Sequence, residues 1–366
     1  MSMEEENRKT DECRGYTIPP LDEAAMEACR NRWLSIAKPL YGLGSLEDAV
    51  IRMAGMTGNV NVSIERKALV IMCADNGVVA EGISQTDSSV TAVVTNNFAK
   101  GLTSACIMSR RAGVDLFPVD IGVGTDTDVY TDKVAYGTKN MAKEPAMTRE
   151  QAVRAVETGI RTARRLKEKG YEILLTGEMG IGNTTTSSAV ASVLLKEDPS
   201  LLSGRGAGLS DAGLDRKKTV IREAIERWKP DPEDPLDVLA KIGGFDIGGL
   251  AGVCIGGAME RLPVVIDGFI AATAALLACR LVPAVRQYLL PSHMSGEPGM
   301  ARILDELELE AFIGCHMKLG EGTGAVAVMP LLDMALDVYK DMPDFEGIRI
   351  EAYRPLGGEQ ERKGEA

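Results

Sequence analysis

Residues 171–195, with the sequence YEILLTGEMGIGNTTTSSAVASVLL, have the pattern of a phosphate-binding segment. An apolar strand is followed by a turn with Gly180 and Gly182, and then by a helix whose first turn contains Asn183 and Thr184. Backbone N–H groups at such a helix start attract anions. No Lys follows the glycines and the G-x-G-x-x-G spacing is absent, which disfavours nucleoside triphosphates and dinucleotides. A monophosphate fits better, although the glycines could also serve only a tight strand-to-helix turn.

Two further segments contain polar groups that could line the same site. In residues 203–218, SGRGAGLSDAGLDRKK, glycines surround Arg205 and a helix begins at Ser210. A cation on this helix, such as Lys217, could pair with a phosphate, and the alternative is an ordinary solvated helix face. Residues 291–299, PSHMSGEPG, are not helical in pattern and offer four polar side chains to a cleft: Ser292, His293, Ser295 and Glu297.

Acidic residues stand at the C-terminal ends of five apolar runs that we expect to be strands. They are Asp75, Asp120, Glu178, Asp267 and Glu321. Ligands bind at that edge of an open α/β sheet, although any one of these acids could instead cap the next turn or helix. Glu321 lies between two glycines before an apolar helix. A partly desolvated carboxylate there could act as a general base, and the alternative is helix capping.

The elements that position these residues alternate along the chain. Apolar runs at 68–75, 114–120, 171–178, 262–267 and 311–321 predict strands, and helical periodicity separates them, for example at 149–168 and 210–228. This alternation predicts an α/β fold with a doubly wound, mainly parallel sheet. Residues 21–58 have helical spacing, and an apolar helix expected at 325–342 could pack beside them. The glycines of 243–263, GGFDIGGLAGVCIGGAMERLP, are interpreted as structural, because small residues let a helix lie close to a sheet.

The composition of the 366-residue chain argues against several classes of protein. Its formal net charge is −12 and it has no Lys/Arg block, so we expect no nucleic-acid partner. The seven cysteines are scattered without a C-x-x-C pair, which indicates free thiols. The polar N-terminus indicates that the chain has no membrane span and is cytoplasmic. The only histidines are His293 and His316, and their spacing offers neither a zinc site nor a Ser-His-Asp triad. We therefore expect an enzyme without a metal.

Seven motifs together resemble the nicotinate-nucleotide–dimethylbenzimidazole phosphoribosyltransferase family. They are ADNGVVAEGIS, GEMGIGNTTT, GRGAGLSDAGLDRKK, GGFDIGGLAG, VVIDGF, PSHMSGEPG and KLGEGTGA, and they follow the family's order over roughly residues 20–340. The resemblance implies a Rossmann-like large α/β domain at residues 61–334 and a small helical domain built from both chain ends, at 16–60 and 335–366. It also implies a homodimer in which the partner subunit helps to close the site, and a reaction without any cofactor. Residues 1–15 are expected to be disordered.

The same resemblance implies the reaction and the residues that perform it. The family moves 5-phosphoribose from nicotinate mononucleotide to 5,6-dimethylbenzimidazole or a related base, which gives α-ribazole 5′-phosphate and nicotinate in cobalamin nucleotide-loop assembly. Glu321 matches the catalytic base. The residues that match the nucleotide and phosphate site are Glu178, Gly180, Gly182, Asn183, Thr184, Gly206, Lys217 and Ser295. Those that match the site of the acceptor base are Thr86, Val94, Met179 and Leu319.

Two departures from the family pattern concern the acceptor. The family commonly has His where this chain has Asn76, and often Pro where it has Asp87, so the acceptor pocket could differ. The alternatives are a paralogue of the same fold that attaches phosphoribose to a phenol or adenine, and a ligand-binding protein without activity. The intact Glu321 and GEMGIGNTT segment argue against the second alternative. A dehydrogenase that uses NAD is disfavoured by the missing dinucleotide fingerprint.

Overall fold

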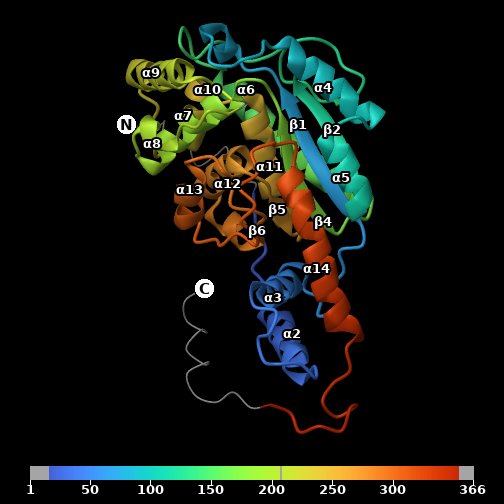
Figure 1. Ribbon diagram of the computed structural model, residues 1–366. Helices are drawn as coiled ribbons and strands as arrows, with labels where there is room; N and C mark the ends of the chain where they lie inside the picture. Colours follow the sequence, from blue (N-terminus) through green and yellow to red (C-terminus); the bar gives the residue numbers. More distant parts are fainter. Residues whose placement is uncertain (1–15, 207, 354–366) are drawn as a thin grey trace.

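Six parallel strands form one sheet in the order β3-β2-β1-β4-β5-β6 in the computed structural model, which describes residues 16–206 and 208–353 (Figure 1). The strands are β1 (Lys67–Ala74), β2 (Val114–Gly122), β3 (Tyr130–Thr131), β4 (Ile173–Met179), β5 (Val264–Ile266) and β6 (Leu289–Pro291). All eight residues of β1 are buried, as expected for the centre of a sheet covered on both faces. The strand order reverses between β1 and β4, which is where ligands bind in such sheets.

Helices cover both faces of the sheet, which confirms the Rossmann-like, doubly wound α/β fold (Figure 1). Helices α6, α10 and α11 lie on one face, and α4, α5 and α14 lie on the other. The α-helices are α2 (Glu23–Ser35), α3 (Ser45–Thr57), α4 (Ser89–Lys100), α5 (Ser104–Ala112), α6 (Arg149–Glu168), α7 (Asn183–Leu195), α8 (Pro199–Leu202), α9 (Asp211–Trp228), α10 (Pro235–Ile242), α11 (Phe245–Met259), α12 (Phe269–Leu281), α13 (Met300–Glu306) and α14 (Thr323–Asp341). Two short 3₁₀ helices are η1 (Gly77–Glu81) and η2 (Pro283–Tyr288).

Glycines bring α6 and α11 into close contact. A Cβ atom on Gly159 of α6 would lie 1.9 Å from the carbonyl oxygen of Gly249, and one on Gly252 of α11 would lie 1.9 Å from that of Val156. Helix α11 is buried along nearly its whole length, in agreement with the structural interpretation of its glycines. Within the described ranges, no helix is both long enough and apolar enough to cross a membrane.

The prediction of a strand at 311–321 is wrong. This segment is irregular and runs beside residues 292–296, joined by hydrogen bonds such as Met294 N–H to the Ile313 carbonyl, at 2.8 Å. His316, Gly320 and Glu321 have positive φ angles, which interrupt the extended backbone that a strand requires. The sheet ends instead at β6, three residues that the sequence did not predict as a strand.

Helices α2 and α3 pack against each other near the C-terminal half of α14, at the bottom of Figure 1. The rings of Trp33 and Tyr339 lie 5.0 Å apart, and the Tyr339 hydroxyl donates to the Val60 carbonyl at 3.0 Å. Helix α14 is continuous from Thr323, so it crosses the boundary expected near residue 335. The division into two domains stays a prediction. Residues 1–15, expected to be disordered, and 354–366 lie outside the described residues.

The contact between α6 and α11 predicts the effect of Gly159→Ala. The added methyl group meets backbone atoms that cannot rotate away, so we expect the free energy of unfolding to fall by about 1–3 kcal/mol. Urea denaturation measures the change. Gly314→Ala is the matched control, because a Cβ there meets no atom within 4 Å. Equal losses in both variants would show that the helix contact is not the cause.

Candidate active site

A cleft of about 170 Å³ opens at the C-terminal ends of β4 and β5. Its walls come from the β4–α7 turn, the start of α12, and the segments around residues 293–297 and 317–323. Nine of the residues predicted for the site line it: Glu178, Met179, Gly180, Asn183, Thr184, Gly206, Ser295, Leu319 and Glu321. Gly182, Lys217, Thr86 and Val94 are not part of the lining.

The turn between β4 and α7 needs its glycines. A Cβ on Gly180 would lie 2.3 Å from the Ala74 carbonyl oxygen, and Gly182 has a φ of 90°, which other residues rarely adopt. Gly182 therefore precedes α7 directly, and Asn183 and Thr184 form its first turn beside the cleft. The positive end of a 13-residue helix faces this end of the cleft.

Lys217 lies behind the first turn of α7. Its side chain is fully buried, and its ammonium group donates to the Thr184 hydroxyl at 3.0 Å and to the Gly204 carbonyl at 3.1 Å. Burial lowers the pKa of Lys217 to about 8, and the charge of Glu297 opposes that shift. Thr184 thus connects the lysine to the cleft.

Glu178 forms the floor of the cleft and is almost fully buried. The Asn183 side-chain amide donates to its carboxylate. Burial, together with the nearby charge of Asp246, raises the pKa of Glu178 well above its ordinary value, although the Asn183 amide and the nearby backbone N–H of Glu321 favour the charged form and oppose this rise. Asp246 itself is fully buried, and burial raises its pKa to about 6, although the adjacent amides of Asn183 and Asn76 hold it lower.

Asp246 is absent from the predicted site because the glycines around it suggested only helix packing. The signal that could have found it is an acid in the first turn of an otherwise apolar helix. Glu178 and Asp246 form a pair of acids in which burial and mutual repulsion favour a protonated form.

Glu321 has an unusual backbone conformation, with a φ of 59° between Gly320 and Gly322, whose φ angles are 84° and 82°. This bend turns the chain from the cleft into α14. The Glu321 carboxylate accepts a hydrogen bond from the backbone N–H of Ala105, at 3.1 Å, in the first turn of α5. Glu321 thus contacts the start of α5 and also lines the cleft, and its role as a general base stays a prediction.

Asp267 and His293, both candidates from the sequence pattern, also line the cleft, although the family resemblance assigned them no role. His293 Nδ1 lies 4.0 Å from Asp267 Oδ1 and 3.0 Å from the Ser292 hydroxyl. Asp267 accepts from the backbone N–H of Ala325 at 2.9 Å, which connects β5 to the start of α14. Burial raises the pKa of Asp267, and the neighbouring histidine opposes this rise. Asp267 was recognisable at the end of a predicted strand, and His293 was recognisable in the polar segment 291–299.

The other two strand-end acids lie away from the cleft. Asp75 accepts from the Gly124 N–H at 2.7 Å, and Asp120 forms an ion pair with Lys133 at 3.0 Å. Of the residues predicted for the acceptor base, Met179 and Leu319 line the cleft. Thr86 is exposed in the loop before α4, and Val94 is half-buried on α4. Among the described residues, no group of three or more His, Cys, Asp or Glu side chains is placed to hold a metal ion.

A parallel α/β sheet with a glycine turn at a helix start and carboxylates in the same cleft is typical of enzymes that act on phosphorylated substrates. The family model described as Phosphoribosyltransferase matches residues 18–350. The chain is 48% identical over 343 residues to the nicotinate-nucleotide–dimethylbenzimidazole phosphoribosyltransferase of Ruminiclostridium cellulolyticum, covering 93% of this chain and 97% of that one. It is 48% identical over 342 residues to the protein of that name from Clostridium acetobutylicum, with the same coverage.

Solved structures agree with these matches. The chain superposes on the crystal structure of CobT from Thermus thermophilus with a TM-score of 0.86 and 36% identity, covering 90% of this chain and 100% of that one. The chain belongs to the nicotinate-nucleotide–dimethylbenzimidazole phosphoribosyltransferase family and is a phosphoribosyltransferase.

The raised pKa of Asp246 predicts how Asp246→Asn changes stability with pH. The folded state binds the proton more tightly than the unfolded state, so the wild-type protein loses stability as pH rises from the unfolded pKa of about 4 toward the folded pKa of about 6. The variant has no such proton. We expect its free energy of unfolding, relative to wild type, to increase by about 1 kcal/mol between about pH 5 and pH 7.5. Urea denaturation at both values measures this, and a difference independent of pH would contradict the assignment.

Proposed function

We propose that the cleft transfers 5-phosphoribose from nicotinate mononucleotide to 5,6-dimethylbenzimidazole or a related base. The products would be α-ribazole 5′-phosphate and nicotinate. One observation carries the proposal: the glycine turn at the start of α7 and the Glu321 carboxylate face the same cleft. The names of the relatives, which are nicotinate-nucleotide–dimethylbenzimidazole phosphoribosyltransferases, support the choice of substrates.

The phosphate is assigned to the end of the cleft formed by Gly180, Thr184, Gly206 and Ser295. The start of α7 attracts an anion there, and the two hydroxyl groups can donate hydrogen bonds to it. Lys217 supports this end indirectly, because its buried ammonium holds Thr184 and the Gly204 carbonyl. Its positive charge is little screened, since the side chain has no exposed surface.

The reaction itself needs one proton acceptor. A ring nitrogen of the benzimidazole attacks the anomeric carbon, and the bond to nicotinate breaks with its electron pair going to the pyridinium nitrogen. The leaving group thus needs no proton, while the other benzimidazole nitrogen must lose one. We assign that proton to Glu321, whose carboxylate is oriented by the Ala105 N–H.

The acceptor is assigned to the end of the cleft near Met179 and Leu319. Both side chains are apolar, and the flexible Met179 can adapt to a flat ring. Thr86 and Val94 stay candidates for this end, on the loop before α4 and on α4 itself. Leu319 is 51% exposed, so the acceptor end is open in a single chain.

A homodimer would cover that open end. Val93 of α4, Leu102 in the loop before α5, and Ile107 of α5 are 58%, 66% and 59% exposed, and helix α5 also contacts Glu321 through Ala105. Apolar side chains on adjacent helices are typical of an interface.

We place the enzyme in the cytoplasm, because the six described cysteines are all free thiols.

Mass spectrometry of the products tests the reaction directly. The purified protein should convert nicotinate mononucleotide and dimethylbenzimidazole to α-ribazole 5′-phosphate, and Glu321→Gln should lower kcat by about 10²–10⁴-fold, because an amide cannot accept the proton. Glu310→Gln, an exposed acid outside the cleft, is the control and should leave kcat unchanged. Product formed only with phenols or adenine would favour a paralogue instead, and near-normal turnover of Glu321→Gln would remove the base assignment.

The pKa of Lys217 predicts how substrate affinity changes with pH. The charged form attracts the phosphate, and this form is lost as pH rises through about 8. KM for nicotinate mononucleotide should therefore increase by up to about tenfold between about pH 7 and pH 9, while KM for the benzimidazole changes little. Lys217→Arg keeps its charge over this range and should not show the increase. Parallel changes in both KM values would indicate a structural role alone.

A further inference from the structure

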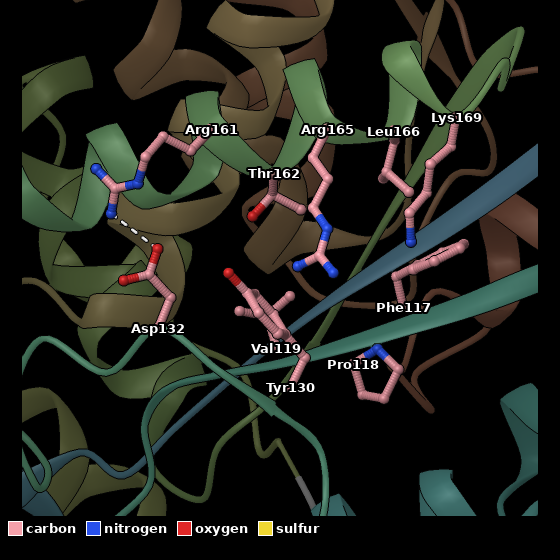
Figure 2. Close-up of a pocket in the computed structure, with 10 residues that line it drawn as sticks. All are labelled: Phe117, Pro118, Val119, Tyr130, Asp132, Arg161, Thr162, Arg165, Leu166 and Lys169. Atoms are coloured by element: carbon pink, nitrogen blue, oxygen red, sulfur yellow. Dashed lines mark hydrogen bonds and ion pairs between the residues drawn. The ribbon is translucent and has the colours of Figure 1, made fainter.

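A second cavity lies between α6 and the β2–β3 edge of the sheet, apart from the cleft (Figure 2). Its volume is about 310 Å³, and none of its lining residues lines the cleft. Strand β3 pairs only with Val119 and Asp120 of β2, so the preceding part of that strand, including Phe117 and Pro118, has no strand neighbour on this side. The floor of the cavity is apolar, with Phe117, Pro118 and Val119 of β2, and Leu166 adds apolar surface from α6 (Figure 2).

Three cations of α6 and its C-terminal end face this cavity at intervals of four residues: Arg161, Arg165 and Lys169 (Figure 2). Such spacing puts them on one side of the helix, where like charges repel. Arg161 is neutralised by Asp132, at 2.8 Å, and lies 3.8 Å from Glu157. Arg165 and Lys169 form no ion pair with any carboxylate of the described residues.

Aromatic rings hold these two cations over the cavity. The Arg165 guanidinium lies 4.5 Å from the centre of the Tyr130 ring, and the Lys169 ammonium lies 5.5 Å from that of Phe117. Contact with the ring faces stabilises the cations without neutralising them. The chain has a net charge of −12, yet these two cations have no acidic partner among its described residues. Beside an apolar floor, they are suited to bind an anion.

We propose that this cavity binds a small aromatic anion, a flat ring with one carboxylate or phosphate group. The anionic group pairs with Arg165 and Lys169, and the ring lies against Phe117 and Pro118. A guanidinium matches both kinds of oxyanion, and the cavity is at the lower end of the range for small-molecule sites. The inference does not rest on the proposed function, because it uses no residue of the cleft.

Methyl NMR separates this cavity from the cleft. Val119 and Leu166 report on the cavity, and Leu319 reports on the cleft. Benzoate, phenyl phosphate and inorganic phosphate are each titrated into the protein. For benzoate and for phenyl phosphate, we expect the Val119 and Leu166 signals to shift together, with the same Kd at both residues. Inorganic phosphate has no ring, so its Kd should be higher by about tenfold or more.

Variants of α6 and its C-terminal end test the two cations. Arg165→Gln and Lys169→Gln should each raise the Kd of phenyl phosphate by about tenfold or more, the usual effect of losing a charge-assisted hydrogen bond. Lys167→Gln is the matched control, because it removes one exposed charge from the same turn but does not line the cavity. Its Kd should stay within about twofold of wild type. The methyl spectra show directly whether each variant is folded.

Three results would overturn the proposal. The first is that no probe shifts Val119 or Leu166, or that Leu319 alone responds. The second is equal weakening in Lys167→Gln and Arg165→Gln, which would indicate general attraction by a basic helix. The third is inorganic phosphate binding as tightly as phenyl phosphate, which would remove the role of the apolar floor.

Discussion

The packing of residues 320–322 against the end of β4 is the contact on which the site depends. A Cβ on Gly177 of β4 would lie 2.8 Å from the Glu321 carbonyl oxygen, so glycine alone allows this approach. This approach brings the backbone N–H of Glu321 near the Glu178 carboxylate, where it favours the charged form and opposes the rise in pKa that burial causes. Two acids that are distant in the sequence are thereby placed in one cleft. The backbone positions of both therefore follow from the close packing of these two segments.

Burial of charged groups gives the cleft its chemistry. Glu178, Asp246 and Asp267 lie where water is excluded, and burial raises the pKa of each. Lys217 is buried nearby, and a pKa of about 8 instead of 10.5 corresponds to about 3 kcal/mol against its charged form. Such groups interact strongly with any charge brought among them, because little solvent screens them. A substrate with an anionic phosphate and a cationic ring would have an oppositely charged partner for each group, the lysine for the phosphate and the acids for the ring.

The sequence predicted the parts of this structure that have strong local patterns. Helix α6 was predicted at 149–168 and occupies those residues, and the apolar runs of β1, β2 and β4 are strands. The prediction of a strand at 311–321 failed because left-handed residues interrupt an apolar run, and β6 was missed because it follows the 3₁₀ helix η2 without an intervening loop. In the site, the glycine turn and Glu321 were recognisable from residue type and position. Asp246 was not, because only the tertiary fold brings α11 beneath that turn.

Helix α14 connects the N-terminal helices α2 and α3 to the cleft. It begins two residues after Glu321, extends over 19 residues, or about 28 Å, and ends where Tyr339 meets Trp33 of α2. A helix of this length acts as a lever, because its hydrogen bonds resist bending everywhere except near Pro330, where one of them is lost. Tilting of α2 and α3 at one end would therefore shift the backbone at the other, so residues far from the cleft can influence the placement of the carboxylate that we propose as the general base.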